Sequence, residues 1–226
     1  MRYFRLSIIN ADLLRRNPKV QVYLRRADKH LEGIGYTEHG LRHATITAKL
    51  SEKILHSLGH SADEVRLAGV AGFLHDIGNV CGRVNHGQSG AIIAHSLLAE
   101  IGMPSEEIAG IMEAIGNHEE ELGQPTSEIS AALILADKSD VHRSRVRTPR
   151  FINFDIHDRV NYAAEESDLH ISQEKRTISL LIKINTEISQ VMEYFEIFLS
   201  RMIICRKASK VLACDFELII NGNKLL

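Results

Sequence analysis

The sequence predicts a mainly α-helical protein in which a helical body is followed by a small α+β module. Apolar residues recur at helical spacing from about Pro18 to Asp140. After about Arg150 the pattern changes, and the β-branched run 177–184 is typical of a strand. Hydrophobic residues make up 44% of the 226 residues and charged residues 25%, as in ordinary globular domains. We therefore expect a helical domain over residues 1–150 and a C-terminal module over 151–226.

Six helices are predicted in the first part, and their ends carry recognisable signals. Pro18 suits the first turn of the first helix, and Gly33 and Gly59 follow the ends of the first and second. Ser61 followed by Glu64 forms a capping-box signature at the start of the third. The predicted helices cover residues 19–31, 40–58, 62–74, 86–101, 105–117 and 127–140.

The last part predicts a small sheet with one long helix. Residues 168–172 and 177–185 read as two strands around the polar turn 173–176, which indicates a hairpin. An amphipathic helix is expected over 187–212, and a third strand over 216–220 ends at Asn221-Gly222. Since no repeat or Pro/Ser-rich linker separates the two parts, we expect them to pack together.

Composition narrows the class of protein. A formal net charge of −2 gives no global field that would favour duplex nucleic acid or a membrane surface. No apolar run approaches about 18 residues, and the N-terminal apolar stretch is too short for a signal peptide. Cys81, Cys205 and Cys214 form no CxxC pair and read as reduced thiols. We therefore expect a cytoplasmic protein.

The pair His75-Asp76 is the most informative feature of the chain. It places an imidazole and a carboxylate side by side at the end of the strongly apolar helix 62–74. Two such groups at the end of a buried helix favour a bound cation. A second pair, His157-Asp158, begins a short predicted helix and has no comparable partners along the chain.

Four further residues are candidate metal ligands at helix ends or on apolar helix faces. They are His43, His86, His118 and Asp137. Imidazole nitrogen and carboxylate oxygen are the ligands that first-row divalent metals prefer. Taken singly, each histidine also fits an ordinary core or helix-end residue, and Asp137 also fits an ion pair with a basic neighbour. Their joint order along the chain favours a metal site.

That order resembles the HD-domain metal-dependent phosphohydrolase superfamily, in which a helical His is followed by His-Asp and by a late Asp. The resemblance covers about residues 36–147, and His-Asp-Ile-Gly and Leu-Ala-Asp-Lys-x-Asp are its more specific pieces. It implies a helical HD-type fold, one or two divalent transition metal ions such as Fe or Mn, and hydrolysis of phosphate esters or anhydrides, often of nucleotides. His86 and His118 match the subset of the superfamily that binds two metals.

The resemblance also implies a role for each ligand. His43, His75, Asp76 and Asp137 would hold one metal, and Asp76 would bridge to a second held by His86 and His118. Two branches look similar: one cleaves symmetrical dinucleoside polyphosphates, and the other is the HD-GYP branch, which hydrolyses cyclic di-GMP. The HD-GYP pattern is broken by Asn79, by Asn117 before His118 and by Gly123-Gln124-Pro125, which argues against cyclic di-GMP.

Other residues near the predicted ligands are candidates for binding substrate. Lys138 and Arg143 are the best candidates to bind phosphate, and the neighbouring Arg145 and Arg147 are further ones; the alternative is a solvated basic run. Glu119 is expected to act as a general acid or to support a ligand, or else to be a solvated charge. His39, four residues before His43, is an extra ligand, a proton donor or a pocket residue.

The sequence therefore predicts a metal-dependent phosphohydrolase acting on a small phosphorylated substrate, most simply a nucleotide. The alternative is a regulatory protein on an HD scaffold that binds nucleotide with little or no turnover. The apolar face of the helix 187–212 is expected to bury against the C-terminal sheet, and a homodimer through that helix is a further expectation.

Overall fold

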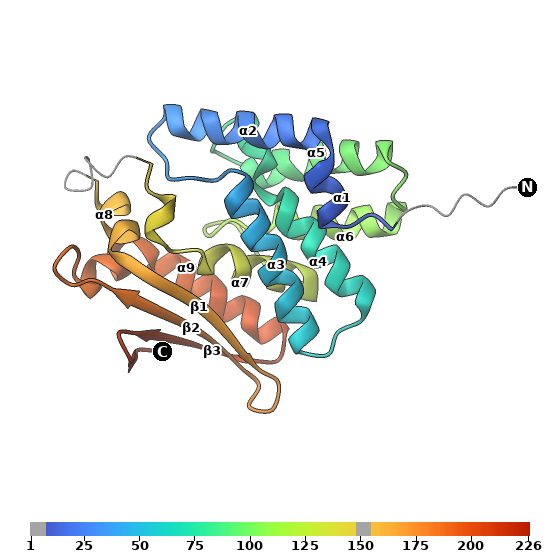
Figure 1. Ribbon diagram of the computed structural model, residues 1–226. Coiled ribbons are helices and arrows are strands. Elements are labelled where there is room, and N and C mark those ends of the chain that lie inside the picture. Colours follow the sequence, from blue (N-terminus) through green and yellow to red (C-terminus); the bar gives the residue numbers. More distant parts are fainter. Residues whose placement is uncertain (1–7, 148–154) are drawn as a thin grey trace, which may run out of the picture.

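The computed structural model describes residues 8–147 and 155–226, and it confirms the mainly α-helical fold with a C-terminal α+β part (Figure 1). The helices are α1 (Ala11–Arg16), α2 (Pro18–Gly33), α3 (Leu41–Ser57), α4 (Ala62–Leu74), α5 (His86–Glu100), α6 (Ser105–Gly116), α7 (Glu128–Ser139), α8 (Ile156–Ala163) and α9 (Val191–Val211). Two 3₁₀ helices are present, η1 (His75–Val80) and η2 (Arg143–Arg145). The strands are β1 (Ala164–Ser172), β2 (Thr177–Ile184), β3 (Asp215–Ile220) and β4 (Asn223–Lys224).

All six predicted helices of the first part are present, with ends within two residues of the predicted ones. Pro18 occupies the first position of α2, and Ser61 and Glu64 form the capping box at the start of α4. The short helix α1 was not predicted, because six residues are too few to show a helical period. Its start is fixed by Asn10, whose side chain accepts a hydrogen bond from the Leu13 N–H at 2.9 Å.

The C-terminal sheet has the strand order β1-β2-β3-β4. β1 and β2 form the predicted antiparallel hairpin, and α9 connects β2 to the parallel strand β3. β1 begins four residues before the predicted start, because its first part is acidic and shows no apolar alternation. The predicted end at Asn221-Gly222 is a turn in which both residues have positive φ, and it returns the chain into the unpredicted strand β4.

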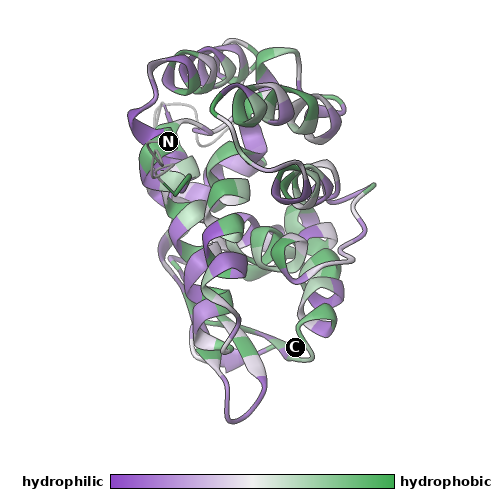
Figure 2. Cartoon of the chain, turned by 90° about the vertical axis from the view of Figure 1, so that its right-hand side faces the viewer, coloured by the Kyte–Doolittle hydropathy of each residue, from purple (hydrophilic) through white to green (hydrophobic). Residues whose placement is uncertain are grey.

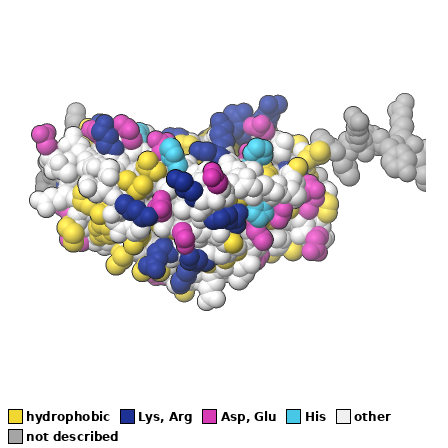
Figure 3. Space-filling model, turned by 90° about the horizontal axis from the view of Figure 1, so that it is seen from below, with side chains coloured by type: hydrophobic (Ala, Val, Ile, Leu, Met, Phe, Trp, Pro, Cys, Tyr) yellow, Lys and Arg dark blue, Asp and Glu magenta, His cyan; other side chains and the backbone are white. Residues whose placement is uncertain are grey.

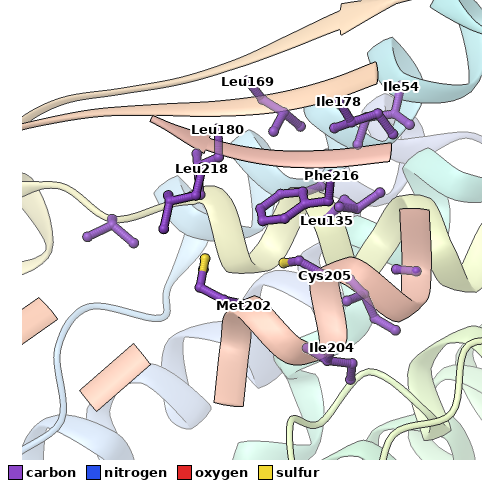
Figure 4. Packing of buried hydrophobic residues seen from close by; sticks show 14 of the residues in the cluster. Ile54, Leu135, Leu169, Ile178, Leu180, Met202, Ile204, Cys205, Phe216 and Leu218 are labelled. Atoms are coloured by element: carbon purple, nitrogen blue, oxygen red, sulfur yellow. The ribbon is translucent and has the colours of Figure 1, made fainter. Parts of the chain in front are cut away.

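Helix α7 lies between two hydrophobic clusters and is buried from Ser130 to Ser139. One cluster contains side chains from every helix from α1 through α6. The other contains side chains from α3, α4, α7, α8, α9 and the sheet. Figure 4 shows the second cluster, where Leu180, Phe216 and Leu218 of the strands face Met202 and Cys205 of α9. Because this cluster crosses residue 150, the C-terminal module shares its core with the helical body.

The surface is mixed in character. Figure 2 shows helices with hydrophobic and hydrophilic stripes, as expected of helices that pack on one side. Basic and acidic side chains lie side by side on the face shown in Figure 3. Among the described residues, no helix combines the length and the apolar character that a membrane crossing requires.

Helix α9 starts at Val191, four residues after the predicted start, because Gln190 and Glu193 form a capping box there. Hydrogen bonds from Arg159 and Ser189 lower the pKa of the Glu193 carboxyl to about 2. A depressed folded-state pKa means that the ionised carboxylate stabilises the fold above its unfolded pKa, and that this stabilisation is lost as pH falls through the folded pKa.

We therefore expect Glu193→Gln to lower the melting temperature near neutral pH and to lose this effect as pH falls from about 4.5 towards about 2. Thermal melts of both proteins across this range measure the difference. A difference that grows on acidification would contradict the assigned role.

Candidate metal centre

The six predicted ligands come from five separate elements and meet at one place. His43 lies in the first turn of α3, His75 and Asp76 begin η1, and His86 is the first residue of α5. His118 follows the end of α6, and Asp137 lies in the last turn of α7. All six are buried, with Asp137 the most exposed at 8%.

Two glycines permit this convergence. A Cβ on Gly72 would lie 2.9 Å from the Ala48 Cα, so α3 and α4 cross too closely for a larger residue. A Cβ on Gly78 would lie 2.0 Å from the carbonyl oxygen of His86, where α5 packs directly on η1. The glycine of His-Asp-Ile-Gly is therefore required to bring His86 next to Asp76.

His43, His75, Asp76 and Asp137 form the first group of ligand atoms. The His43 Nε2 lies 3.2 Å from the His75 Nε2 and 3.2 Å from the Asp137 Oδ1. The Asp76 Oδ2 lies 3.3 Å from the His75 Nε2 and 3.6 Å from the His43 Nε2. Two ligands about 2.1 Å from a shared ion are separated by about 3.0–3.4 Å. The spacings of 3.2, 3.2 and 3.3 Å fit one metal, and the fourth, at 3.6 Å, is slightly longer.

His86 and His118 form the second group, and Asp76 joins the two. The His86 Nε2 lies 3.1 Å from the His118 Nε2 and 3.4 Å from the Asp76 Oδ1. One oxygen of Asp76 therefore faces the first group and the other faces the second. Asn79 donates a hydrogen bond of 2.8 Å to this Oδ1, so the residue that departs from the HD-GYP pattern orients the shared carboxylate.

The four histidines use Nδ1 for their hydrogen bonds to carbonyl and carboxylate oxygens, so every Nε2 is directed into the site. The Nδ1 atoms of His75, His86 and His118 donate to backbone carbonyl oxygens at 2.9, 3.0 and 2.6 Å, and that of His43 donates to Asp140. A histidine that donates from Nδ1 presents a lone pair on Nε2 in its neutral form. The Nε2 of His43 faces that of His75, and the Nε2 of His86 faces that of His118. A cation between the two nitrogens of a pair would stabilise this arrangement.

The carboxylates of the site also call for a cation. The Asp76 Oδ2 is buried and has no hydrogen-bond partner among the described residues. Burial opposes ionisation of Asp76 and Asp137, yet neighbouring His75 and Lys138, respectively, hold their pKa values well below the ordinary range. Burial also opposes a charge on His75, but Asp76 and Asp137 raise its pKa to about 10. Without metal, a proton on His75 is therefore the cation that these carboxylates hold.

The second group contains a neutral imidazole. Burial, His86 and His75 together lower the pKa of His118 to about 3, so its ring is neutral near neutral pH. A neutral imidazole that presents its Nε2 lone pair is suited to a divalent first-row metal. The donor set therefore fits two metal ions that share Asp76.

Asp140, the last residue of Leu-Ala-Asp-Lys-x-Asp, fixes the orientation of His43. Its Oδ2 accepts the His43 Nδ1–H at 2.7 Å, and the guanidinium of Arg42 binds both carboxylate oxygens at 3.0 and 3.2 Å. The sequence motif contained this residue, but its contact with His43 was visible only in the fold. Such carboxylate–histidine pairs set the tautomer and direction of a ligand.

We expect Asp140→Asn to weaken metal binding about 10- to 100-fold, because an amide holds the His43 tautomer less firmly than a carboxylate. Competition with a coloured chelator measures the affinity. Asp215→Asn, at an exposed carboxylate paired with Lys210, is the matched control. Equal affinities in Asp140→Asn and the wild type would show that Asp140 does not support the ligand.

A cavity of about 640 Å³ opens beside the candidate metal centre, with His86 in its wall. Lys138, a predicted phosphate-binding residue, and Glu119, predicted as a general acid or as support for a ligand, line it. The Lys138 Nζ lies 2.7 Å from the Asp137 Oδ2 and 3.3 Å from the Glu120 Oε1. Burial lowers the pKa of Lys138, but the two carboxylates raise it by more. The pKa is therefore raised overall, and the amine is protonated near neutral pH.

Glu119 is placed to support a ligand and not to donate a proton. Its Oε1 accepts the Gly87 N–H at 2.8 Å and lies 3.4 Å from the His86 Nδ1. Although burial opposes ionisation, these groups lower the pKa of Glu119 to about 2. The carboxylate is ionised near neutral pH, which favours the supporting role among those considered from the sequence.

The predicted arginines after Asp137 do not line the cavity. Arg143 pairs with Glu165 at 3.0 Å and lies over the Tyr162 ring. Arg145 is buried and donates to the carbonyl oxygens of Asp140 and Glu38, and Arg147 binds Asp28. Arg145 and Arg147 thus hold the chain after α7 against the helical body, whereas Arg143 contacts α8 and β1. The arrangement gives no support to a phosphate clamp at Arg143.

Three other residues of the cavity wall offer polar groups in their place. Arg83, in the loop before α5, donates to the His86 Nε2 at 3.3 Å, and Arg201 comes from α9. His39 lies in the loop before α3 and donates from Nδ1 to the Thr37 carbonyl oxygen at 2.7 Å, so it is a pocket residue with a free Nε2. No sequence signal marked Arg83 or Arg201, because each occurs as an isolated basic residue.

Comparison with known proteins agrees with this fold and site. Residues 36–142 match the HD domain family. This segment carries the buried His/Asp clusters, which are consistent with a metal site. The resemblance seen in the sequence is thus confirmed.

The chain is similar to other proteins in sequence and in structure. An uncharacterized protein of Methanocaldococcus jannaschii is 27% identical over 206 residues, which cover 80% of this chain and 79% of the relative. The crystal structure of a predicted HD superfamily hydrolase from an uncultured Thermotogales bacterium is 25% identical and superposes with a TM-score of 0.44, covering 58% of this chain and 73% of that one.

Proposed function

We propose that this protein is a metal-dependent phosphohydrolase acting on a nucleotide or a related small phosphate ester or anhydride. The observation that carries the proposal is the carboxylate of Asp76, which separates two pairs of histidine Nε2 atoms and presents one oxygen to each pair. A shared carboxylate between two sets of nitrogen ligands is suited to a two-metal centre.

In this proposal His43, His75, Asp76 and Asp137 hold one metal, and Asp76, His86 and His118 hold the other. Metals bound there would polarise a phosphate oxygen and activate a water as the nucleophile. Asp140 orients His43 and Glu119 orients His86, each through the Nδ1 side of the imidazole ring. Lys138, from the cavity wall, contributes positive charge next to Asp137.

Arg83 is the proposed phosphate-binding arginine. Its Nη1 lies 3.3 Å from the His86 Nε2 and 3.9 Å from the Asp76 Oδ1, so it is within reach of both ligands. A lone pair engaged by a metal no longer accepts a hydrogen bond, so a metal held by His86 would leave this N–H group of Arg83 available to a phosphate oxygen. A guanidinium beside the metals and in the cavity wall can then bind phosphate oxygens in the fork geometry that arginine offers.

Metal analysis followed by phosphate release from a panel of nucleotides tests the proposal. We expect tightly bound divalent metal and metal-dependent turnover, both lost in His75→Ala and kept in His95→Ala, whose side chain is exposed on α5. Stabilisation by nucleotides without turnover would support the regulatory alternative. Less than one equivalent of metal, with His75→Ala equal to the wild type, would contradict the proposal.

A further inference from the structure

The cavity beside the metal centre is built by both parts of the chain. The helical body contributes Arg83, His86 and Lys138 to its wall. Helices α8 and α9 contribute the opposite wall, which includes Asn161 and Arg201. A molecule that places its phosphate at the metals therefore extends its remaining atoms towards the C-terminal module.

Asn161 lines this cavity and carries a buried hydrogen-bond acceptor that no described residue uses. Its side chain is 4% exposed, and its Nδ2 donates to the His157 carbonyl oxygen at 2.8 Å within α8. That bond fixes the amide orientation, since only the nitrogen can donate to a carbonyl. The Oδ1 has no partner among the described residues, and a buried acceptor left so costs about 1–3 kcal/mol. A ligand N–H or O–H would satisfy it.

Arg201 is held rigidly in the same wall. Its Nε donates to the Glu120 Oε1 at 2.8 Å, and its guanidinium lies 4.2 Å above the centre of the Phe198 ring. Among the described residues, no side chain or carbonyl accepts a hydrogen bond from its two Nη groups. A planar guanidinium fixed in this way can donate to a carbonyl or hydroxyl oxygen of a ligand.

The charge of the cavity wall limits how much phosphate a ligand carries. Its basic side chains are Arg83, Lys138 and Arg201, against five carboxylates, which are Glu119, Glu120, Glu121, Asp155 and Asp158. Lys138 and Arg201 are both paired with Glu120. A chain of several phosphates would need surplus positive charge beyond the metals, and the described residues of this wall supply none.

We propose that the C-terminal module forms a specificity subsite for the organic group of a phosphate monoester that is rich in N–H and O–H donors, such as a nucleoside monophosphate. Asn161 accepts a hydrogen bond from this group, Arg201 donates one to it, and the carboxylates of the wall favour a single phosphate over a polyphosphate. This inference rests on the proposed phosphohydrolase function, because it assigns the phosphate to the metal centre.

A pair of substitutions at Asn161 tests the subsite in the full-length, metal-loaded protein. Asn161→Leu and Asn161→Asp both lose the bond to His157, but only Asn161→Asp keeps an oxygen acceptor. The probes are nucleoside monophosphates, the matching triphosphates and p-nitrophenyl phosphate, whose organic group has no donor. Asn223→Leu, at an exposed residue of β4, is the control.

For the best nucleoside monophosphate we expect Asn161→Leu to raise KM about 10-fold or more, which corresponds to one lost hydrogen bond. Its kcat should stay within about twofold of the wild type, Asn161→Asp should recover most of the KM, and turnover of p-nitrophenyl phosphate should be unchanged. Equal KM values in Asn161→Leu and the wild type, or a higher kcat/KM for triphosphates than for monophosphates, would overturn the inference.

Thermal shift separates this failure from failure of the proposed function. If no phosphate compound is hydrolysed but nucleoside monophosphates stabilise the wild type and not Asn161→Leu, the subsite stands and the hydrolase proposal fails. If hydrolysis is metal-dependent and Asn161→Leu matches the wild type, the hydrolase proposal stands and the subsite fails. If neither turnover nor stabilisation occurs, both fail.

Discussion

Asp76→Asn should lower phosphate release by more than about 100-fold. Substitution of a residue that hydrogen-bonds to a metal ligand lowers metal affinity or activity about 10- to 100-fold. Asp76 faces both groups of ligand atoms directly, so a larger loss is expected. An asparagine of the same shape offers only one oxygen, and its nitrogen would face either the His43–His75 pair or His86. The substitution therefore removes the ligand shared by the two proposed metals while leaving the packing of η1 almost unchanged.

Steady-state turnover of the best phosphate substrate, measured beside the metal content of the same sample, checks this expectation. Asp63→Asn is the matched control, because the Asp63 side chain is 84% exposed and pairs with Arg66 at the surface. Turnover in Asp76→Asn within about tenfold of the wild type would exclude a bridging role for this carboxylate.

Removing metal should lower the melting temperature by about 8–16 °C. A ligand present at about 1,000 times its Kd stabilises the folded state by about 4 kcal/mol, and each kcal/mol shifts the melting temperature of a chain of this size by about 2–4 °C. The physical reason lies in the site, where the buried Asp76 Oδ2 has no hydrogen-bond partner among the described residues and the Nε2 atoms of His86 and His118 face each other at 3.1 Å.

Calorimetry of the protein before and after dialysis against a chelator measures this shift. Adding back Mn²⁺ or Fe²⁺ should restore the melting temperature, and Asp76→Asn should respond little to either treatment. A wild-type protein whose melting ignores the chelator would show that no structural metal occupies the site.

The helical body could be predicted closely from the sequence because its elements carry local signals. A capping box marks the start of α4, proline opens α2, and glycines follow α2 and α3. The additional strand β4 and the early start of β1 escaped prediction, since both depend on pairing with a neighbouring strand and not on their own residues.

The six candidate ligands could be predicted because chemistry that binds metal is unusual at buried helix ends. Their neighbours could not. Asp140, Arg83 and Asn161 are ordinary polar residues in the sequence, and only the packing of α7, η1 and α8 shows what each contacts. Arg143 shows the converse, because a basic run beside a ligand suggested phosphate binding, whereas the fold pairs this arginine with Glu165.

The central claim is a centre of two metals that share Asp76, and metal stoichiometry tests it most directly. Elemental analysis of wild-type protein and His118→Ala, with protein concentration from amino-acid analysis, gives the ratio. We expect about two equivalents in the wild type and about one in His118→Ala, since His43, His75 and Asp137 still hold the first metal. Less than one equivalent in the wild type, or the same metal content in both proteins, would contradict the claim.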